Sequence, residues 1–198
     1  MESYEATIEY YFEKTVKEFE RLSNLPESSE VCLWFENDLF CQVNMWFVLS
    51  VLPKQSNLKV FRIFPIIENG EPWKGFGNAN TDSLEKAFSS KVKFQQKDID
   101  LGVNLWEAYQ KNDYKQLKEL SKNRSNCFEY LEEVCQAHID RFPSNNSLGK
   151  PEQLIKDLIN TKSIEFHEVF QAFSERAGIY GFGDLQVKSI FERQINSL

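Results

Sequence analysis

The chain has 198 residues, with 30 acidic against 23 basic side chains and a net charge of −7 at pH 7. This length suits one ordinary domain, or a compact domain with a small appendage, and 17 Phe, 7 Tyr and 4 Trp supply a large core. The negative charge disfavours non-specific nucleic-acid binding. The first 25 residues lack the continuous apolar stretch of a signal peptide or membrane anchor, so we expect a cytoplasmic protein that contacts no membrane.

Cysteine spacing indicates neither a metal site nor a disulfide framework. The four cysteines stand at 32, 41, 127 and 135, in apolar or amphipathic surroundings, and form no C-x-x-C pair. We interpret them as reduced, mostly buried thiols. The sequence predicts no metal site and identifies no cofactor.

The first third of the chain predicts a strand, a helix and a second strand. Residues 8–25 have the apolar spacing of an amphipathic helix. The continuous apolar run at 31–35 is typical of a strand buried on both faces, and 39–52 is a nearly all-apolar helix that ends at Pro53. A second strand is predicted at 58–67, and this order indicates a βαβ unit with parallel strands.

The remainder of the chain is mostly helical in pattern. A loop rich in glycine and aromatic residues at 68–80 is expected to dock on the protein. Helices are predicted at 83–90, 97–110, 113–123, 127–141, 150–160, 165–177 and 184–195. The last three, interrupted by Gly-rich residues 178–183, weakly resemble a winged helix.

The sequence therefore predicts an α/β fold that is predominantly helical by residue count. Its centre is a short parallel βαβ core covered by many helices. We divide it into an α/β core at 1–90, a helical region packed on that core at 91–145 and a small helical C-terminal unit at 146–198.

The carboxyl end of the first predicted strand carries the most informative side chains. Glu36 and Asp38 follow that strand directly, and Gln42 lies one turn into the next helix. Ligands of open α/β sheets bind at this edge, so two carboxylates and an amide are expected to converge there. Paired carboxylates can hold a divalent cation, act as general acid and base, or accept hydrogen bonds from a ligand. The alternative is structural: Asp38 caps the helix and Glu36 pairs with an arginine.

The loop after the second predicted strand is a candidate for ligand contact. Gly75 and Gly77 would let the backbone approach a ligand closely, and Lys74 adds a positive charge. If the two strands are parallel, this loop lies at the same sheet edge as Glu36. The pattern is neither a dinucleotide fingerprint nor a P-loop, and an ordinary turn is the alternative.

Residues near two helix ends complete the candidate site. His138 and Arg141 share a helix face, where the histidine could move protons near neutral pH and the arginine could bind a phosphate or carboxylate. Alternatively, both offset the helix dipole. Asp184 either belongs to the site or caps the last helix. We predict catalytic roles for Glu36, Asp38 and His138, and ligand binding by Gln42, Lys74, Gly75, Gly77, Arg141 and Asp184.

Five blocks of sequence spread over nearly the whole chain carry a family likeness. They are Leu33-Trp-Phe-Glu-x-Asp-Leu-Phe-x-Gln42, Lys74-Gly-Phe-Gly77, Leu105-Trp-x-Ala-Tyr109, Ala137-His-x-x-Arg-Phe-Pro143 and Gly181-Phe-Gly-Asp184. In these blocks the chain resembles the bacterial domain-of-unknown-function 1835 family. The first and third blocks are the most specific, and the resemblance implies a bacterial protein without implying an activity.

The family resemblance also implies a further N-terminal part with two strands, which has no counterpart here. The chain is then a truncated form, a shortened gene product or a divergent member. A sheet of two strands alone leaves an exposed edge that invites pairing, so we expect self-association.

Two functions of different classes follow. The first is the binding or hydrolysis of a nucleotide or other phosphorylated small molecule at the strand edge near Glu36 and Asp38. The second is a regulatory or adaptor role, in which the C-terminal unit binds a protein or nucleic acid. A contiguous basic face would favour nucleic acid, and an apolar patch would favour protein. That basic face would be formed by Lys150, Lys156, Lys162, Lys188 and Arg193.

Overall fold

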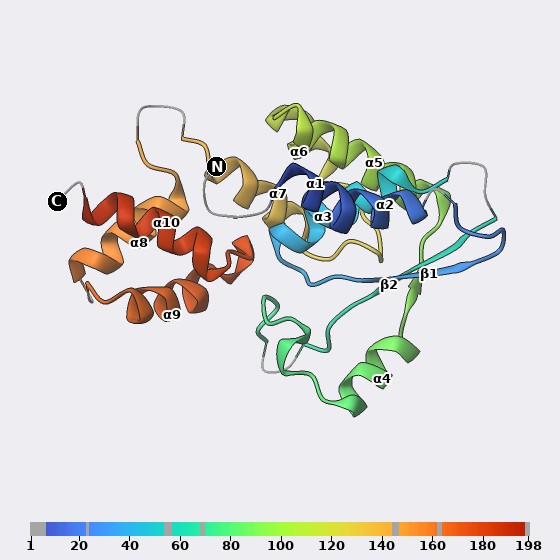
Figure 1. Cartoon of the computed structure of the whole chain (residues 1–198), viewed down its shortest axis with the longest axis horizontal. Coiled ribbons are helices and arrows are strands. Elements are labelled where there is room, and N and C mark those ends of the chain that lie inside the picture. The colour runs from blue at the N-terminus through green and yellow to red at the C-terminus, as the bar shows by residue number, and fades with distance from the viewer. Residues whose placement is uncertain are drawn as a thin grey trace.

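A computed structural model describes residues 7–22, 24–53, 57–67, 70–143, 147–161 and 164–196 of the chain. It confirms an α/β fold that is mostly helical, with a small sheet covered by helices (Figure 1). Within these residues, no helix is both long enough and apolar enough to span a bilayer.

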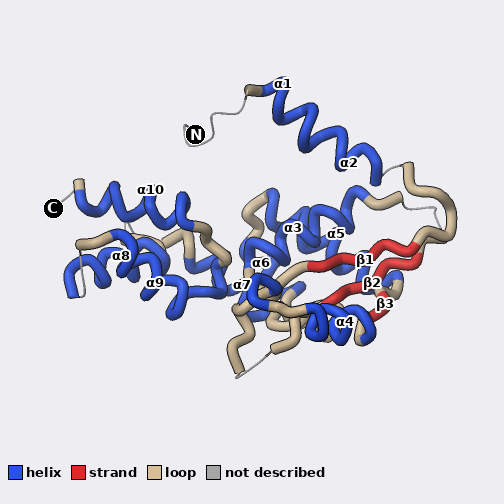
Figure 2. The backbone as a smooth tube through the Cα atoms, turned by 60° about the horizontal axis from the view of Figure 1, so that its bottom comes forward, coloured by secondary structure: helices blue, strands red, loops and turns tan. Residues whose placement is uncertain are grey.

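The sheet confirms the predicted βαβ unit and adds a strand that the sequence did not predict. Strand β1 (Glu30–Trp34) and strand β2 (Lys59–Ile63) are parallel, and helix α3 (Leu39–Val51) connects them. Strand β3 (Val92–Lys93) pairs antiparallel with β2, which gives the order β1-β2-β3 (Figure 2). Two residues are too few to show a strand pattern in sequence. The described sheet therefore has three strands and not two, and the self-association that we expected from a two-stranded sheet stays a prediction.

Helix α3 is the centre of the core. Met45, Trp46 and Leu49 are buried on it. Helix α5 (Gln96–Gln110) packs along it, and Gly102 permits this because a Cβ there would lie 2.4 Å from Leu49 Cδ1. Two shorter helices follow, α6 (Tyr114–Leu120) and α7 (Leu131–Asp140), and both pack against this layer.

Helix α7 begins four residues later than the sequence predicted. Tyr130 precedes it with a φ of 55°, a left-handed conformation that a helix cannot contain. Cys127 thus lies in the preceding turn, and not on the helix that carries Cys135. All four cysteines are free, as predicted, and Cys127 and Cys135 are buried.

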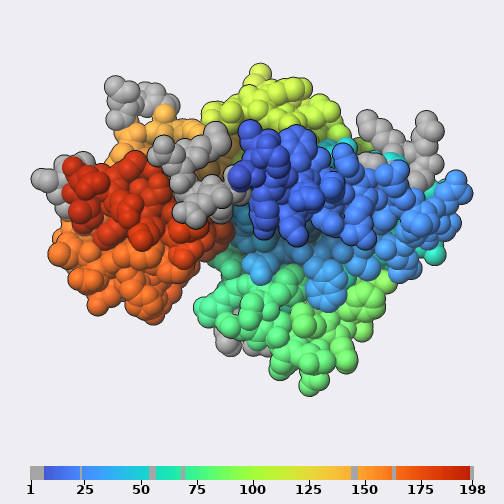
Figure 3. Space-filling model, in the orientation of Figure 1, coloured from blue at the N-terminus to red at the C-terminus, as the bar shows by residue number. Residues whose placement is uncertain are grey.

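The N-terminal helical segment lies on the outer surface of the α/β part (Figure 3). It consists of α1 (Ile8–Tyr11), a π-helical turn (Phe12–Val16) and α2 (Lys17–Leu22). Phe19 packs edge to face on Phe47 of α3 with ring centroids 4.8 Å apart, whereas the aromatic residues of α1 remain exposed. The segment is therefore attached mainly through its second half.

The described part of the glycine-containing loop docks through aromatic contacts, as expected. It includes a 3-10 turn (Phe76–Asn78) and leads into helix α4 (Thr81–Ser89). Trp73 meets Tyr130 edge to face, and Phe76 meets Trp34 of β1. These contacts hold the loop against the carboxyl end of the sheet.

The C-terminal helices gather at one end of the molecule (Figure 1). Helices α8 (Lys150–Thr161), α9 (Phe166–Ala177) and α10 (Asp184–Ile195) pack on one another. A 3-10 turn (Gly178–Tyr180) joins α9 to the Gly-rich residues, so the excursion described here is not the β-ribbon of a winged helix. One buried cluster includes residues from all three predicted domains, whose boundaries stay a prediction.

Candidate functional site

Glu36 fixes the glycine-containing loop at the carboxyl end of β1. Its Oε1 accepts a hydrogen bond of 2.7 Å from the backbone N–H of Phe76. Its carboxyl group fills the space beside Gly75, where a Cβ would lie 1.7 Å from Glu36 Cδ. Two segments that are 40 residues apart therefore meet at one sheet edge, as the parallel strands predict.

Asp38 caps helix α3, which is the structural alternative considered for it. Its Oδ1 accepts a 2.9 Å hydrogen bond from the N–H of Cys41, and the side chain is buried. Gly181 covers this carboxylate, because a Cβ at that position would lie 2.0 Å from Asp38 Oδ1. Gly181 also has a φ of +63°, which favours glycine. The C-terminal unit thus contacts the strand edge directly.

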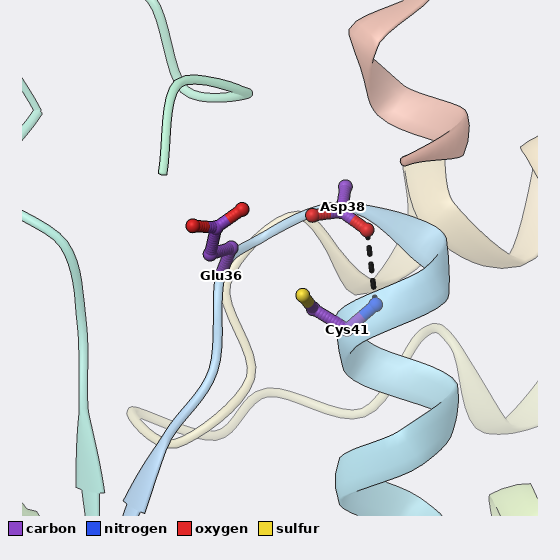
Figure 4. Close-up of side chains that lie close together, drawn as sticks. All are labelled: Glu36, Asp38 and Cys41. Carbon is purple, nitrogen blue, oxygen red and sulfur yellow. Dashed lines mark hydrogen bonds between the residues drawn. The ribbon is translucent and has the colours of Figure 1, made fainter. Parts of the chain in front are cut away.

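Glu36, Asp38 and Cys41 form a compact cluster (Figure 4). One potential ligand atom from each lies within 4.8 Å of the others. Burial raises the pKa of Asp38, and burial together with the Asp38 charge raises the pKa of Cys41 to about 12. Cys41 is therefore a protonated thiol at neutral pH. Binding of a cation by this cluster would release the Cys41 proton, so its affinity would rise with pH.

Arg62 is a central residue that the sequence reasoning missed. It lies on β2, is 1% exposed, and its Nη2 donates a 3.0 Å hydrogen bond to the backbone carbonyl of Glu36. Its Nε and Nη1 have no hydrogen-bond partner among the described residues, and burial lowers its pKa to about 10. The signal for it was an arginine in the middle of an otherwise apolar stretch of strand, because a charge is seldom buried without a specific reason.

Gln42 lies in the interior and not at an open edge. Its Nε2 donates to the carbonyl of Asn37 at 2.9 Å and to that of Glu129 at 2.8 Å, and the residue is fully buried. It joins the start of α3 to the turn before α7. We therefore assign Gln42 a structural role. Its side chain is buried and reaches no open surface, so the structure does not support the predicted contact with a ligand.

A pocket of about 270 Å³ lies on the outer side of the glycine-containing loop. It is lined by Pro65, Ile66, Glu71, Lys74, Ser83 and residues 75–79. Lys74 is exposed and pairs with Glu71 at 2.6 Å. The predicted ligand-binding residues Lys74, Gly75 and Gly77 therefore share one pocket, which Glu36 supports from behind.

His138 is enclosed by aromatic rings. It is 2% exposed, its ring centroid lies 4.5 Å from that of Tyr109, and Tyr114 and Phe142 contact it as well. Burial, with a smaller contribution from the Arg141 charge, lowers its pKa to about 4. The structure therefore does not support His138 as a proton shuttle near neutral pH.

Arg141 and Asp184 lie away from the glycine-containing loop. The Arg141 guanidinium lies over the rings of Phe142 and Phe182, at 5.6 and 5.3 Å from their centroids. Asp184 is exposed at the first position of α10, and Gly183, not Asp184, is the residue that precedes the helix. The pocket beside Lys74 includes neither residue.

The predicted basic face of the C-terminal unit is partly neutralised. Lys150 pairs with Asp140, and Arg193 pairs with Glu152 at 3.1 Å. Lys156 and Lys188 are exposed, and Lys162 lies outside the described residues. These contacts give no specific support to nucleic-acid binding, and the adaptor role stays a prediction.

Comparisons of the chain with protein-family models, with curated proteins and with solved structures gave no match. The likeness to the domain-of-unknown-function 1835 family therefore stays a prediction, and the functional argument rests on the site itself.

Proposed function

We propose that the protein binds a small phosphorylated molecule in the pocket beside Lys74. The observation that carries the proposal is the hydrogen bond from Phe76 to Glu36. This bond holds the backbone of Gly75 and Phe76 in place, so that the pocket is formed before a ligand arrives.

The groups around the pocket suit a phosphate. Lys74 supplies a positive charge, Ser83 a hydroxyl group and Gly77 a stretch of backbone without a side chain. Ser83 lies in the first turn of α4, and its own backbone N–H is already donated to the Asn80 side chain.

The volume of the pocket limits the ligand. At about 270 Å³ it lies slightly below the range of roughly 300–1,000 Å³ that is typical of sites for drug-sized molecules. A small phosphorylated compound suits this volume better than a whole nucleotide, part of which would extend beyond the pocket. The predicted nucleotide is therefore the less suitable form of this hypothesis.

Lys74 must exchange its partner when an anion binds. Its present ion pair with Glu71 is exposed on both sides, with side-chain exposures of 66% and 46%. Exposed pairs of this kind contribute about 0–1 kcal/mol, so breaking the pair costs little. Glu71 also lines the pocket, and its carboxylate must turn away from the bound anion. The proposal covers binding alone: the described lining of this pocket contains no histidine, His138 is buried, and His167 lines a neighbouring pocket that Lys74 also borders.

Isothermal titration calorimetry with glycerol 3-phosphate tests this function, with glycerol as the neutral control. Lys74→Gln should weaken binding about tenfold, since a hydrogen bond to a charged group is worth roughly 1.5–3 kcal/mol. Gly77→Leu should abolish binding, because a Cβ there points into open space and a larger side chain would enter the pocket.

Lys86→Gln is the matched control, since it removes the same charge from an exposed position on α4 outside the pocket. The affinity of this variant for glycerol 3-phosphate should equal that of the unmodified protein. No heat of binding at millimolar glycerol 3-phosphate, or an equal loss with Lys86→Gln, would contradict the proposed site.

A further inference from the structure

An aromatic groove of about 580 Å³ lies between the N-terminal segment, α3, α5 and the C-terminal unit. Its walls include Tyr11, Phe40, Phe47, Trp106 and Phe182. Tyr11 is 55% exposed and Phe40 is 54% exposed, so apolar surface faces solvent at this groove. Its volume falls within the range of roughly 300–1,000 Å³ that small-molecule sites occupy.

Arg141 is the one formally charged residue among the described residues that line the groove. It forms no ion pair within the described part of the chain, and its guanidinium lies over the ring of Phe182. Asp140, the neighbouring acid, is already paired with Lys150. Among the described residues none accepts a hydrogen bond from the Arg141 guanidinium, so the groove offers one positive charge between aromatic walls, on a chain whose net charge is −7.

We propose that this groove binds a small organic carboxylate with an apolar body, such as a medium-chain fatty acid. The aromatic walls would cover the body, and the Arg141 guanidinium would bind the carboxylate. This proposal does not depend on the function proposed for the pocket beside Lys74, whose lining residues are all different.

The charge of the ligand's head group favours a carboxylate over a phosphate in this groove. A carboxylate carries a single negative charge, which one arginine balances. A phosphate monoester carries about −1.5 to −2 at pH 7 and would need further donors. The two amide side chains of the groove are partly engaged, since Asn44 donates to the carbonyl of Phe40 and Gln186 accepts from the N–H of Gly183. The other polar groups include the hydroxyls of Thr15 and of three tyrosines.

Such a ligand would connect three parts of the chain. Tyr11 and Phe19 come from the N-terminal segment, Trp106 from α5, and Phe182 from the C-terminal unit. A bound apolar body would contact all of them at once. Binding should therefore raise the unfolding temperature of the protein, because a ligand that binds only the native state stabilises it.

The test is a titration with decanoate and with decanol, which share a tail and differ in charge. Calorimetry measures affinity, and tryptophan fluorescence reports the site through Trp106. Arg141→Gln should weaken decanoate about tenfold and leave decanol unchanged, and Arg141→Lys should restore part of the loss. Arg176→Gln is the matched control, because it removes an exposed arginine outside the groove.

Trp106→Phe should remove most of the fluorescence change while calorimetry still detects decanoate. The proposal is overturned if decanoate binds no more tightly than decanol, or if Arg141→Gln leaves decanoate binding intact. Equal loss of both ligands in Arg141→Gln would also overturn it, since Arg141 would then only maintain the shape of the groove.

Discussion

The strand edge and the aromatic groove are neighbouring regions that differ in how their charged side chains are bonded within the protein. Gly181 packs on Asp38 at the strand edge, and the next residue, Phe182, lines the groove. At the strand edge, Glu36 and Asp38 each accept a backbone hydrogen bond that holds a loop or a helix. In the groove, the Arg141 guanidinium forms no ion pair with a described residue.

This difference shows that carboxylates in a sheet-edge position need not be the groups that contact a ligand. Glu36 and Asp38 build the edge, and the open surface lies beside them, at Lys74 and at Arg141. Substitutions at the edge should therefore reduce the stability of the fold, whereas substitutions in the open regions should change binding alone.

The largest expected effect concerns pH and His138, which lies behind the groove. Its pKa is about 4 in the fold and about 6.5 in an unfolded chain, so the unfolded state binds the proton more strongly between these values. Stability should fall by on the order of 3 kcal/mol as pH falls from about 6.5 to 4. The pH dependence should fade above pH 6.5 and be absent above about pH 7.5, where the histidine is neutral in both states. Urea unfolding of the protein and of His138→Phe across this range measures the difference.

Asp38, at the strand edge, should partly offset this loss of stability as pH falls. Its pKa is raised in the fold, so its contribution favours the folded state as pH falls toward its ordinary value. Asp38→Asn should therefore make the acid destabilisation steeper. A pH profile of His138→Phe that matches the unmodified protein would contradict the account of the buried histidine.

A second prediction compares two glycines on either side of Phe182. Gly181→Ala should cost about 2 kcal/mol, because it strains a positive φ and displaces the Asp38 carboxylate. Gly183→Ala should cost far less, since its Cβ meets no atom within 4 Å and its φ is −75°. Chemical denaturation of both variants checks the contrast, and equal losses would be inconsistent with contact between Gly181 and Asp38.

The helix cap gives a smaller effect. Asp38→Ala should destabilise the protein by about 1 kcal/mol, because the N–H of Cys41 loses its acceptor at the start of α3. Asp38→Asn should cost at most a few tenths of a kcal/mol, since asparagine is an equally good cap and the substitution removes a buried charge. Thermal unfolding at neutral pH measures both, and a cost in Asp38→Asn as large as in Asp38→Ala would show that charge, and not capping, is what the fold requires.

The smallest effect is expected at the glycine-containing loop. Gly75→Ala must push the Glu36 carboxyl group aside and break its bond to Phe76, at a cost of about 0.5–1 kcal/mol. Gly77→Ala should be close to neutral, because its Cβ meets open space. Amide hydrogen exchange at Phe76 should accelerate in Gly75→Ala alone. Unchanged exchange there would mean that Glu36 does not hold the loop.

Patterns that span many residues predicted the fold well. The βαβ unit and the long helices followed from apolar periodicity and from Pro53, and the meeting of Glu36 with Gly75 followed from parallel strands. Strand β3 has two residues, and the start of α7 depends on the left-handed backbone of Tyr130. Neither leaves a pattern that a sequence can show.

The candidate site was predicted less completely, for physical reasons that concern burial. Gln42 and His138 are polar residues on helices, and both are buried. Their positions in the helical repeat do not show whether a polar side chain points into the core or toward a ligand. In the sequence, Arg62 is a basic residue within a predicted strand. Nothing in the sequence indicates that its guanidinium donates a hydrogen bond to the backbone carbonyl of Glu36. The groove depends on residues from Tyr11 to Gln186, and only the tertiary structure brings them together.

The most direct test of the central claim, a ligand site on the loop that Glu36 supports, is an amide NMR titration with glycerol 3-phosphate. The account predicts saturable shifts at Gly75, Phe76 and Gly77, with the Trp106 indole in the groove unchanged. Unchanged loop amides at saturating ligand, or shifts confined to the groove, would contradict it.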